Sequence, residues 1–512
     1  MSHKRKVLQG SASNMVRVLL SMLVSLVLPP FLVHRMTPAE YSAWVLILQM
    51  SAYVNLLDFG LQTAIGKFVA EHDASGDRDA NRSLVSTSFT ILAGTAAIGC
   101  AAIFLMTWSV PRLFHQMPAA LIPEVRLALL AVGLSTALTL PFGTFLSTFV
   151  GLQQYLFPTI IATLSRVGSA AALIVLLLMH GNLVELAIAM AAFNVAAAAS
   201  QFLGWRKFVK SRVGFSFFFF DRRSAVKLAK YGSVLSIWTV AMLLISGLDV
   251  VIVGHFDYRN TGFYAVASSI TNFMLLVVGS IFGPVLPAVS SIQAGSTPAH
   301  IGDLVTRLTR YCTLLLCLLG LPILFGAYPL LSLWVGHQYA IRSALYLEIL
   351  VIGNVVRQLT YPYVLVVVAT GRQHLTTISA IAEATVNILV SVVLVTRIGA
   401  DGVAIGTLVG AFVGLGMHLA VSMHFTQPTI QIRRLRFALR ALARPLLCVA
   451  PSLLLYPFWK RSNMVPANPV LLALWAVLSL SVAWQIGLTR EDRQGFMSAL
   501  SRLLYWRRLE QT

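Results

Sequence analysis

Charged residues are scarce in this sequence, and acidic residues are scarcer still. Only 11% of the residues carry a charge and 57% are hydrophobic, whereas soluble domains are about 25% charged. Apolar runs of about 20 residues, the length that crosses the core of a bilayer, recur along the whole chain. These proportions exclude a soluble protein and predict an integral membrane protein.

Cysteine is also rare. The four cysteines, each inside an apolar run, are Cys100, Cys312, Cys317 and Cys448. Their spacing fits neither a zinc site nor a disulfide framework, so we interpret them as apolar side chains. The sequence therefore predicts no metal and no bound cofactor, and it leaves coupling to H+ or Na+ open.

Acidic residues are outnumbered, because the chain has 38 Lys and Arg against 18 Asp and Glu. Binding of nucleic acid would need a basic face on a soluble module. Here the basic residues lie in short loops between apolar runs, so we expect no nucleic-acid partner. Basic loops mark the cytoplasmic side of a membrane protein. Most Lys and Arg fall on that side if both termini are cytoplasmic, which predicts a multi-pass protein of the cell inner (plasma) membrane.

The apolar runs predict about fourteen transmembrane helices. Helices satisfy their own backbone hydrogen bonds in lipid, whereas isolated strands cannot. The predicted helices span residues 14–34, 41–66, 87–108, 124–150, 156–179, 183–203, 231–254, 262–288, 309–335, 343–369, 375–396, 402–424, 441–459 and 468–487. An even number agrees with both termini on one side of the membrane.

Similar short stretches recur about 220 residues apart. They are Phe59-Gly60 and Phe282-Gly283, Gly151 to Tyr155 and Gly371 to Leu375, and Gly181 and Gly399. Each pair occupies the same place in the order of helices, so helices 1–6 and 7–12 are predicted to be two copies of one unit. A shift by six helices keeps both copies in the same orientation, as parallel repeats. Two such lobes predict an alternating-access transporter with its substrate site between them.

This interpretation divides the chain into five parts. They are an N-terminal lobe at 1–203, a basic cytoplasmic linker at 204–230, a C-terminal lobe at 231–425, two extra helices within 426–489, and a cytoplasmic tail at 490–512. Phe496, Leu500 and Leu504 share one face of the tail, which predicts an amphipathic helix on the membrane surface.

Three stretches resemble a known family. They are Leu57-Asp58-Phe59-Gly60-Leu61 with Gly76-Asp77, Leu248-Asp249 with Gly254, Gly262 and Tyr264, and Ala369-Thr370-Gly371-Arg372. The chain resembles the polysaccharide-biosynthesis flippases of the multidrug/oligosaccharidyl-lipid/polysaccharide (MOP) exporter superfamily. The resemblance covers helices 1 to 12, and the last two helices are similar to those of the fourteen-helix branch.

The resemblance implies two six-helix bundles arranged as a V around a central cavity. It implies a flippase for undecaprenyl-pyrophosphate-linked oligosaccharide in O-antigen, capsule or exopolysaccharide synthesis. The partners that it implies are the polyprenyl-pyrophosphate-linked oligosaccharide, membrane lipids, and a polysaccharide polymerase with its export machinery.

Two arginines are predicted near mid-membrane, where charge is costly and usually functional. Arg166 lies about 10 residues, or about 15 Å, into its helix, and Arg357 lies at a similar depth. The repeat assigns them to opposite lobes, so we expect both to face one cavity. Guanidinium binds phosphate oxygens bidentately, which suits a pyrophosphate. Alternatively, each arginine pairs with a carboxylate such as Glu348 or Glu383 and only braces helices.

Two further basic residues are candidates for substrate binding. Arg17 lies within about a turn of the cytoplasmic end of its helix, where it either meets the substrate or extends its charged end to the interface. Lys67 ends the second helix and either contacts the headgroup or only marks topology.

Three acids are candidates for coupling or ion pairing. Glu383 is the most deeply placed, and it either pairs with an arginine, carries a coupling proton or binds a cation. Asp58, beside Gly60, is predicted to cap or kink its helix. Asp249 lies about a turn from the outer end of its helix, where it gates the path or pairs with Arg259.

Other functions remain as alternatives. A cation-coupled multidrug exporter of the same superfamily would need an acidic or aromatic cavity, which mid-depth arginines disfavour. A lipid II flippase has the same charge logic with a different headgroup. A membrane enzyme would need a nucleophile–base–acid cluster, and the short outer loops carry none, so we predict that the protein is not an enzyme.

Overall fold

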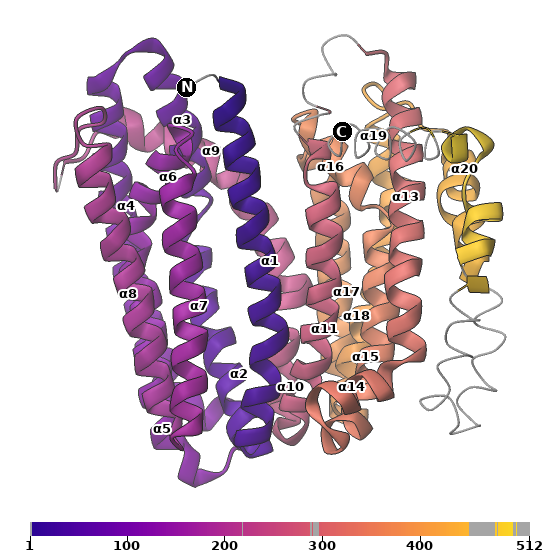
Figure 1. The fold of residues 1–512 in the computed structure, drawn as a ribbon, viewed down its shortest axis with the longest axis horizontal. Coiled ribbons are helices and arrows are strands. Elements are labelled where there is room, and N and C mark those ends of the chain that lie inside the picture. The colour runs from indigo at the N-terminus through magenta and orange to yellow at the C-terminus, as the bar shows by residue number, and fades with distance from the viewer. Residues whose placement is uncertain are drawn as a thin grey trace, which may run out of the picture. The chain divides into compact units, whose positions relative to one another are not determined.

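The computed structural model describes residues 3–217, 219–286, 289, 296–449, 477–478, 480–494 and 498. Within them the chain forms helices and turns, without a strand (Figure 1). Ten helices of this part are long and apolar enough to cross a membrane, and two shorter apolar helices lie at the predicted first and seventh spans. The all-helical prediction is confirmed here. The predicted helices at 441–459 and 468–487 lie partly outside the described residues.

The first six predicted spans correspond to the elements up to α8. Their bounds are α1 His3–Arg35, α2 Pro38–Ala52, η1 Tyr53–Asp58, α3 Leu61–Ser75, α4 Arg78–Leu113, η2 Ala119–Leu121, α5 Ile122–Thr139, η3 Leu140–Phe142, α6 Gly143–Gly151, α7 Leu156–Leu178 and α8 Leu183–Phe208. Asp77 and Asn182 cap α4 and α8 through their side-chain oxygens, which satisfies backbone N–H groups at each helix start.

The rest of the described chain continues in the same way. Its elements are α9 Arg222–Met242, η4 Leu243–Gly247, α10 Asp249–Phe256, α11 Tyr258–Phe282, α13 Pro298–Phe325, α14 Ala327–Val335, α15 His337–Gln358, α16 Tyr361–Ala369, α17 His374–Ile398, α18 Ala400–Met417, η6 His418–Ser422, α19 Met423–Phe425, α20 Arg434–Phe437, η7 Ala438–Ala443, α21 Arg444–Leu446, η8 Leu447–Val449 and η10 Ala483–Gly487. Helix α9 begins within the predicted linker, because Asp221 accepts hydrogen bonds from the N–H groups of Arg223 and Ser224 and so caps it.

Several spans break where the backbone cannot continue a helix. In the second span, Phe59 and Gly60 separate η1 from α3, with left-handed φ angles of 48° and 68°. In the fourth span, η3 around Pro141 separates α5 from α6. In the tenth span, α15 ends at Gln358, and Pro362 lies in the first turn of α16. Proline lacks the N–H that a continuous helix would use.

The chain forms two compact units. Unit 1 comprises Met1–Phe273, Trp334–Tyr346 and Ala384–Thr407, and unit 2 comprises Met274–Leu333, Leu347–Glu383 and Leu408–Thr512. The boundaries run inside α11, α14, α15, α17 and α18. The two six-helix lobes and the five-part division stay predictions.

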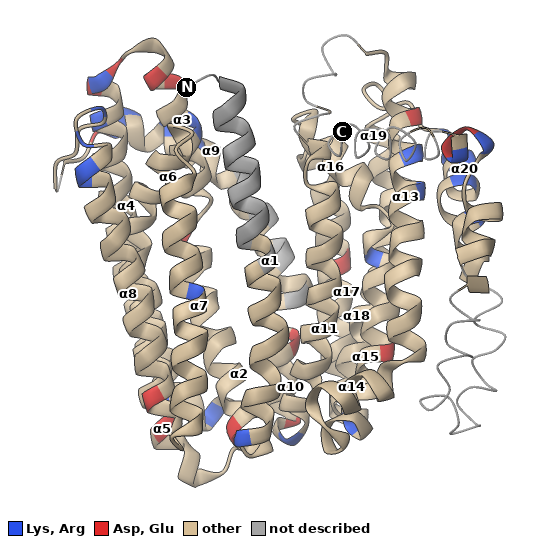
Figure 2. Cartoon of the chain, viewed as in Figure 1, with Lys and Arg blue, Asp and Glu red and all other residues tan. Residues whose placement is uncertain are grey.

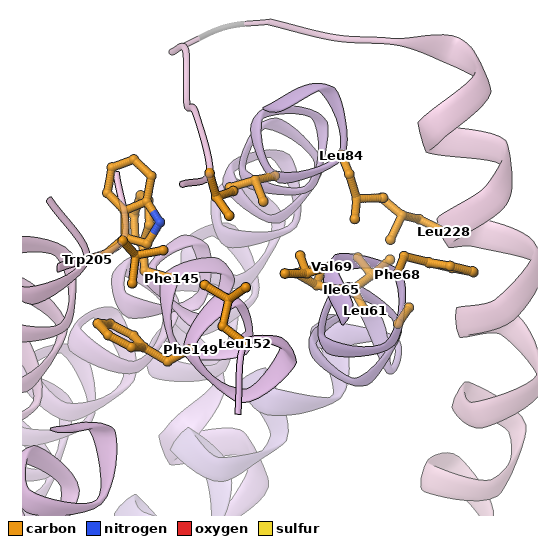
Figure 3. Close-up of a cluster of buried hydrophobic side chains, with 14 of the residues drawn as sticks. Leu61, Ile65, Phe68, Val69, Leu84, Phe145, Phe149, Leu152, Trp205 and Leu228 are labelled. Atoms are coloured by element: carbon orange, nitrogen blue, oxygen red, sulfur yellow. The ribbon is translucent and has the colours of Figure 1, made fainter. Parts of the chain in front are cut away.

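A large apolar cluster stabilises the N-terminal part of unit 1 (Figure 3). Leu61, Ile65 and Phe68 of α3 face the cluster together with Phe145 of α6 and Trp205 of α8. Buried aromatic rings supply large contact areas and tilted ring pairs. The cluster fixes α3, which follows the break at Gly60.

The start of the predicted tail is fastened within unit 2. Asp492 forms an ion pair with Arg310 of α13 at 3.1 Å, and it accepts a hydrogen bond from the Tyr311 hydroxyl at 2.7 Å. Thr489 donates its N–H to the same carboxylate at 3.0 Å. Burial alone would raise the pKa of Asp492, but the hydrogen bonds from Thr489 and Tyr311 and the charge of Arg310 outweigh it and lower that pKa. Most of the predicted amphipathic tail lies outside the described residues.

Candidate functional site

The charged residues gather near the ends of the helices, and few lie between (Figure 2). Arg357 and Glu383 are exceptions. Arg357 near the end of α15 donates from Nε to Glu383 Oε1 of α17 at 2.5 Å, and its Nη1 donates to Asn354 Oδ1 at 3.1 Å. Their side chains are only 12% and 7% exposed. Unit 2 therefore contains a buried, hydrogen-bonded ion pair inside a membrane span.

A glycine makes room for this ion pair. A Cβ at Gly414 of α18 would collide with the Glu383 carboxylate, so the carboxylate lies directly against the α18 backbone. Arg357 Nη2 is buried and has no hydrogen-bond partner among the described residues. A buried donor without a partner is costly, so this nitrogen is available to an incoming acceptor.

Arg166 has a different environment, in unit 1. It lies on α7, it is exposed, and its Nη2 donates to Ser25 Oγ of α1 at 3.2 Å. Among the described residues, no carboxylate is within ion-pair distance of its guanidinium. The cavity predicted to be shared by Arg166 and Arg357 stays a prediction.

The other basic candidates lie within helices, Lys67 in α3 (Leu61–Ser75) and Arg17 in α1 (His3–Arg35), and not at the helix ends that the sequence predicts. Lys67 of α3 is exposed, with its Nζ 4.5 Å from the centre of the Tyr231 ring and 5.4 Å from that of Phe68. These are cation–π contacts, which leave the ammonium group accessible. Arg17 has its backbone in α1, but its side chain lies outside the described residues.

Asp58 is placed at the break in the second span. Its Oδ1 accepts a hydrogen bond from the Gln62 N–H at 3.3 Å. The carboxylate thus satisfies a free N–H at the start of α3. A hydrogen bond of this kind is what the predicted capping role requires.

Asp249 lies in a buried polar cluster in unit 1. It begins α10 and is only 6% exposed. Its Oδ2 accepts hydrogen bonds from Thr407 Oγ1 at 2.9 Å and from the Tyr264 hydroxyl at 3.2 Å. Both partners come from other helices, α18 and α11, so the carboxylate joins three helices.

Further oxygens continue from this carboxylate. Thr407 Oγ1 also donates to the Val403 carbonyl at 3.2 Å, which Ser391 Oγ approaches at 3.4 Å. Ser391 Oγ in turn donates to Asn387 Oδ1 at 3.1 Å. These partners are not among the residues that the sequence predicts, although Asn387 and Ser391 are polar residues four apart in an apolar helix, which places them on one face.

The turn before Asp249 is a π-helical segment, η4. Its Gly247 carbonyl accepts hydrogen bonds from Gln49 at 2.8 Å and Tyr53 at 2.6 Å, and its Ile245 carbonyl accepts one from Asn387 at 2.6 Å. Such π-bulges leave carbonyls without helical partners and frequently occur at functional sites. The seventh span, predicted as one helix at 231–254, is thus interrupted beside the polar cluster.

Comparisons of this fold with solved structures define the class of protein. The lipid II flippase MurJ in an inward-closed conformation has a TM-score of 0.70 at 12% identity, over 97% of this chain and 100% of that chain. A variant of the MATE transporter VcmN from Vibrio cholerae has a TM-score of 0.60 at 17% identity, over 83% and 97%. A MOP superfamily transporter from Pyrococcus furiosus, described as having a binding pocket of reverse polarity, has 0.54 at 14%, over 80% and 94%. The fold is that of the MOP transporters.

Residues 7–293, more than half of the chain, match the polysaccharide biosynthesis protein family, and the chain belongs to this family. A comparison with curated protein sequences finds no significant match. The protein is thus a multi-pass membrane protein of the polysaccharide biosynthesis family with the fold of the MOP transporters. The family recognised from the sequence is confirmed.

Proposed function

We propose that the protein is a flippase that moves undecaprenyl-pyrophosphate-linked oligosaccharide across the plasma membrane for O-antigen, capsule or exopolysaccharide synthesis. One observation carries the proposal. In a member of the polysaccharide biosynthesis family, Arg357 keeps a buried guanidinium nitrogen inside a membrane span, and this nitrogen has no partner in the part of the chain that the structure describes.

The chemistry of the substrate fits this nitrogen. A pyrophosphate must leave water to cross the membrane, and an unpaired buried charge is very costly. Arginine stays protonated at any working pH and binds phosphate oxygens with a planar fork of donors. Hydrogen bonds between charged groups are roughly twice as strong as neutral ones. A buried guanidinium therefore offsets part of the desolvation cost of the pyrophosphate.

The ion pair supports a two-state mechanism of binding and release. Glu383 and the pyrophosphate compete for Arg357, because both are anions that use the same donors. When the substrate is absent, Glu383 neutralises Arg357, as in the structure. When the pyrophosphate arrives, it takes the place of Glu383 at the Arg357 donors. The exchange links substrate binding to the charge of one carboxylate.

Arg166 is proposed as the second arginine of the pathway, because its guanidinium has no carboxylate partner among the described residues. Arg17 and Lys67 are proposed to attract the headgroup before it enters. Alternating access between two six-helix lobes would then carry the substrate from one side of the membrane to the other.

We assign coupling to the polar cluster around Asp249. One buried carboxylate followed by hydroxyl, carbonyl and carboxamide oxygens supplies one negative charge and several neutral ligands. Hard monovalent cations and protons suit such oxygens better than divalent ions, which usually take more carboxylates. Substitution of Thr407 tests whether the coupling ion is Na+ or H+. It would remove an oxygen ligand for Na+ and leave the Asp249 carboxylate, the proton acceptor, in place.

The proposed location is the cell inner membrane with both termini in the cytoplasm, because this orientation places most of the 38 Lys and Arg inside. The proposed partners are the lipid-linked oligosaccharide, membrane lipids, and the polysaccharide polymerase with its export machinery.

Complementation tests the proposal. In cells that lack their own flippase for lipid-linked oligosaccharide, the wild-type chain should restore surface polysaccharide, and Arg357→Ala and Arg166→Ala should not. Arg126→Ala is the matched control, because the hydrogen bonds of Arg126 to described residues go to the backbone carbonyls of Thr107 and Trp108, at 3.2 and 3.1 Å. Full export by both alanine variants, with protein levels matched, would contradict the role of the arginines.

The fold similarity to the lipid II flippase MurJ favours lipid II as a second candidate substrate. The two candidates differ in the headgroup and share the pyrophosphate. Cells depleted of their lipid II flippase distinguish them: rescue of growth there, without rescue of surface polysaccharide in the first strain, would favour lipid II.

A further inference from the structure

Unit 1 contains a cavity of about 450 Å³ within its N-terminal bundle, lined by residues of α2, η1, α3, α5, η3, α6 and α8. This volume falls in the range of ligand pockets, about 300–1,000 Å³. None of the residues discussed above as binding or coupling candidates lines it. The cavity is therefore a feature that the proposed pyrophosphate and coupling chemistry does not use.

The lining of this cavity is polar but uncharged. Four carboxamides and three hydroxyls contribute to it, from Asn55, Gln62, Asn194, Gln201, Ser51, Thr136 and Thr139. Among the described residues that line it, none is Asp, Glu, Lys or Arg. Carboxamides both donate and accept hydrogen bonds, and so do hydroxyls. A cavity with these groups matches a ligand that has many hydroxyls and no charge.

Ser51 gives a second, independent indication of a ligand. It lines the cavity, is only 2% exposed, and its Oγ has no hydrogen-bond partner among the described residues. Ser88 of the same bundle, by contrast, donates to the Leu84 carbonyl at 2.7 Å. Leaving a buried hydroxyl without a partner is costly, and a polar group entering the cavity would satisfy it.

We propose that this cavity is a saccharide site, which binds neutral sugar units of the transported oligosaccharide through the carboxamides and the Ser51 hydroxyl. The proposal rests on the proposed function, since it assigns a place to the sugar part of the same substrate. An ionic ligand is disfavoured because no charged side chain of the lining would neutralise it. A lipid tail is disfavoured because it would leave the carboxamides and Ser51 without hydrogen bonds.

The direct test is photo-crosslinking in cells that make the natural substrate. A benzophenone amino acid replaces Met190 or Leu146, two apolar lining residues, so that no polar group of the cavity is lost. The control position is Ile188, on α8 as Met190 is, but 56% exposed and outside the lining. Adducts are oxidised with periodate and labelled with a hydrazide, which reports vicinal diols of any sugar.

A glycan on the adducts at Met190 or Leu146, and none at Ile188, is the expected result. Adducts without glycan at both lining positions, in cells that still export polysaccharide, would overturn the proposal. The proposed function has a separate readout, the binding of inorganic pyrophosphate to the purified protein. Loss of pyrophosphate binding with glycan adducts intact would contradict the pyrophosphate site and leave the saccharide site standing.

Substitution of Ser51 gives a second test. Ser51→Ala removes a hydroxyl that has no partner, so the variant should be at least as stable to heat as the wild type. Its export rate should nevertheless fall by several fold, and Gln201→Ala combined with it should lower export further. Ser88→Ala is the matched control: it loses a bonded hydroxyl away from the cavity and should keep the wild-type rate. Unchanged export in the double variant would argue that the cavity holds only water.

Discussion

Glu383 lies between Arg357 and Gly414, so that one carboxylate contacts a guanidinium of α15 and the bare backbone of α18. This arrangement realises ion pairing, one of the roles that the sequence left open for Glu383, and it leaves Arg357 with an unused donor. The Arg357–Glu383 ion pair therefore has two possible roles. It braces three helices of unit 2, and it holds the Arg357 guanidinium in place for a competing anion.

Substitution of Arg357 distinguishes the structural role of the ion pair from its role in substrate binding. Arg357→Ala leaves Glu383 buried without its partner, which should cost about 3–5 kcal/mol of stability. The double variant Arg357→Met with Glu383→Leu removes both charges, and replacing a buried pair by apolar residues is often neutral. We expect the double variant to regain the thermal stability of the wild type while surface polysaccharide stays absent. Export restored together with stability would show that the pair only braces the helices.

Arg357→Lys is the conservative variant. Lysine keeps the charge but lacks the planar fork. Loss of one hydrogen bond to a charged group costs about 1.5–3 kcal/mol, which corresponds to roughly a tenfold or greater loss of affinity. We expect inorganic pyrophosphate to bind more weakly by that factor in calorimetry, with partial export in cells. Equal affinity in the wild type and Arg357→Lys would argue against bidentate recognition.

Glu383→Gln tests the proposed competition. The amide keeps a hydrogen-bond acceptor near Arg357 and removes the negative charge that opposes the pyrophosphate. Inorganic pyrophosphate should therefore bind the purified variant about tenfold more tightly or better, while export slows because release is no longer assisted. Weaker binding in Glu383→Gln would exclude competition between the carboxylate and the substrate. Glu348→Gln is the control, because it makes the same change in charge on α15 at a residue outside the Arg357–Glu383 pair.

The sequence predicts the helical elements better than their internal breaks and partners. The break at Gly60 lies in a stretch that the sequence singles out, and the break at Pro141 follows from the N–H that proline lacks. The π-helical segment η4 does not follow from local chemistry, because its carbonyls are satisfied by Gln49 and Asn387, residues far away along the chain. The hydrogen-bond partner of Asp249 is equally hard to predict. The apolar run around Asp249 indicates that this residue is buried, but its donor Thr407 lies 158 residues further along the chain. Contacts between distant helices depend on packing that a single sequence does not specify.

Asp249 and Thr407 make the coupling ion testable. Asp249→Asn removes the charge that would attract a proton or Na+, so transport into proteoliposomes should lose its response to both gradients. Thr407→Val removes only a neutral oxygen. If Na+ is the ion, this variant should need a higher Na+ concentration for the same rate; if it is H+, the pH dependence should hardly change. A gradient response that persists in Asp249→Asn would assign coupling to another group.

Asp492 predicts how stability depends on pH. Its pKa in the folded protein lies below the usual value, about 3.9, so the ion pair with Arg310 contributes stability above that value. This contribution falls as pH drops through the lowered pKa, because the carboxylate becomes protonated. Asp492→Asn should therefore lower Tm clearly at pH 7, where a buried partner is lost at a cost of about 3–5 kcal/mol. The difference in Tm between wild type and variant should shrink below about pH 4.

Asp303→Asn on α13, an acid outside the ion pairs of the described residues, is the control and should leave Tm unchanged at both pH values. A difference in Tm that is as large at pH 3 as at pH 7 would mean that packing around residue 492, and not its charge, fastens the start of the tail to α13.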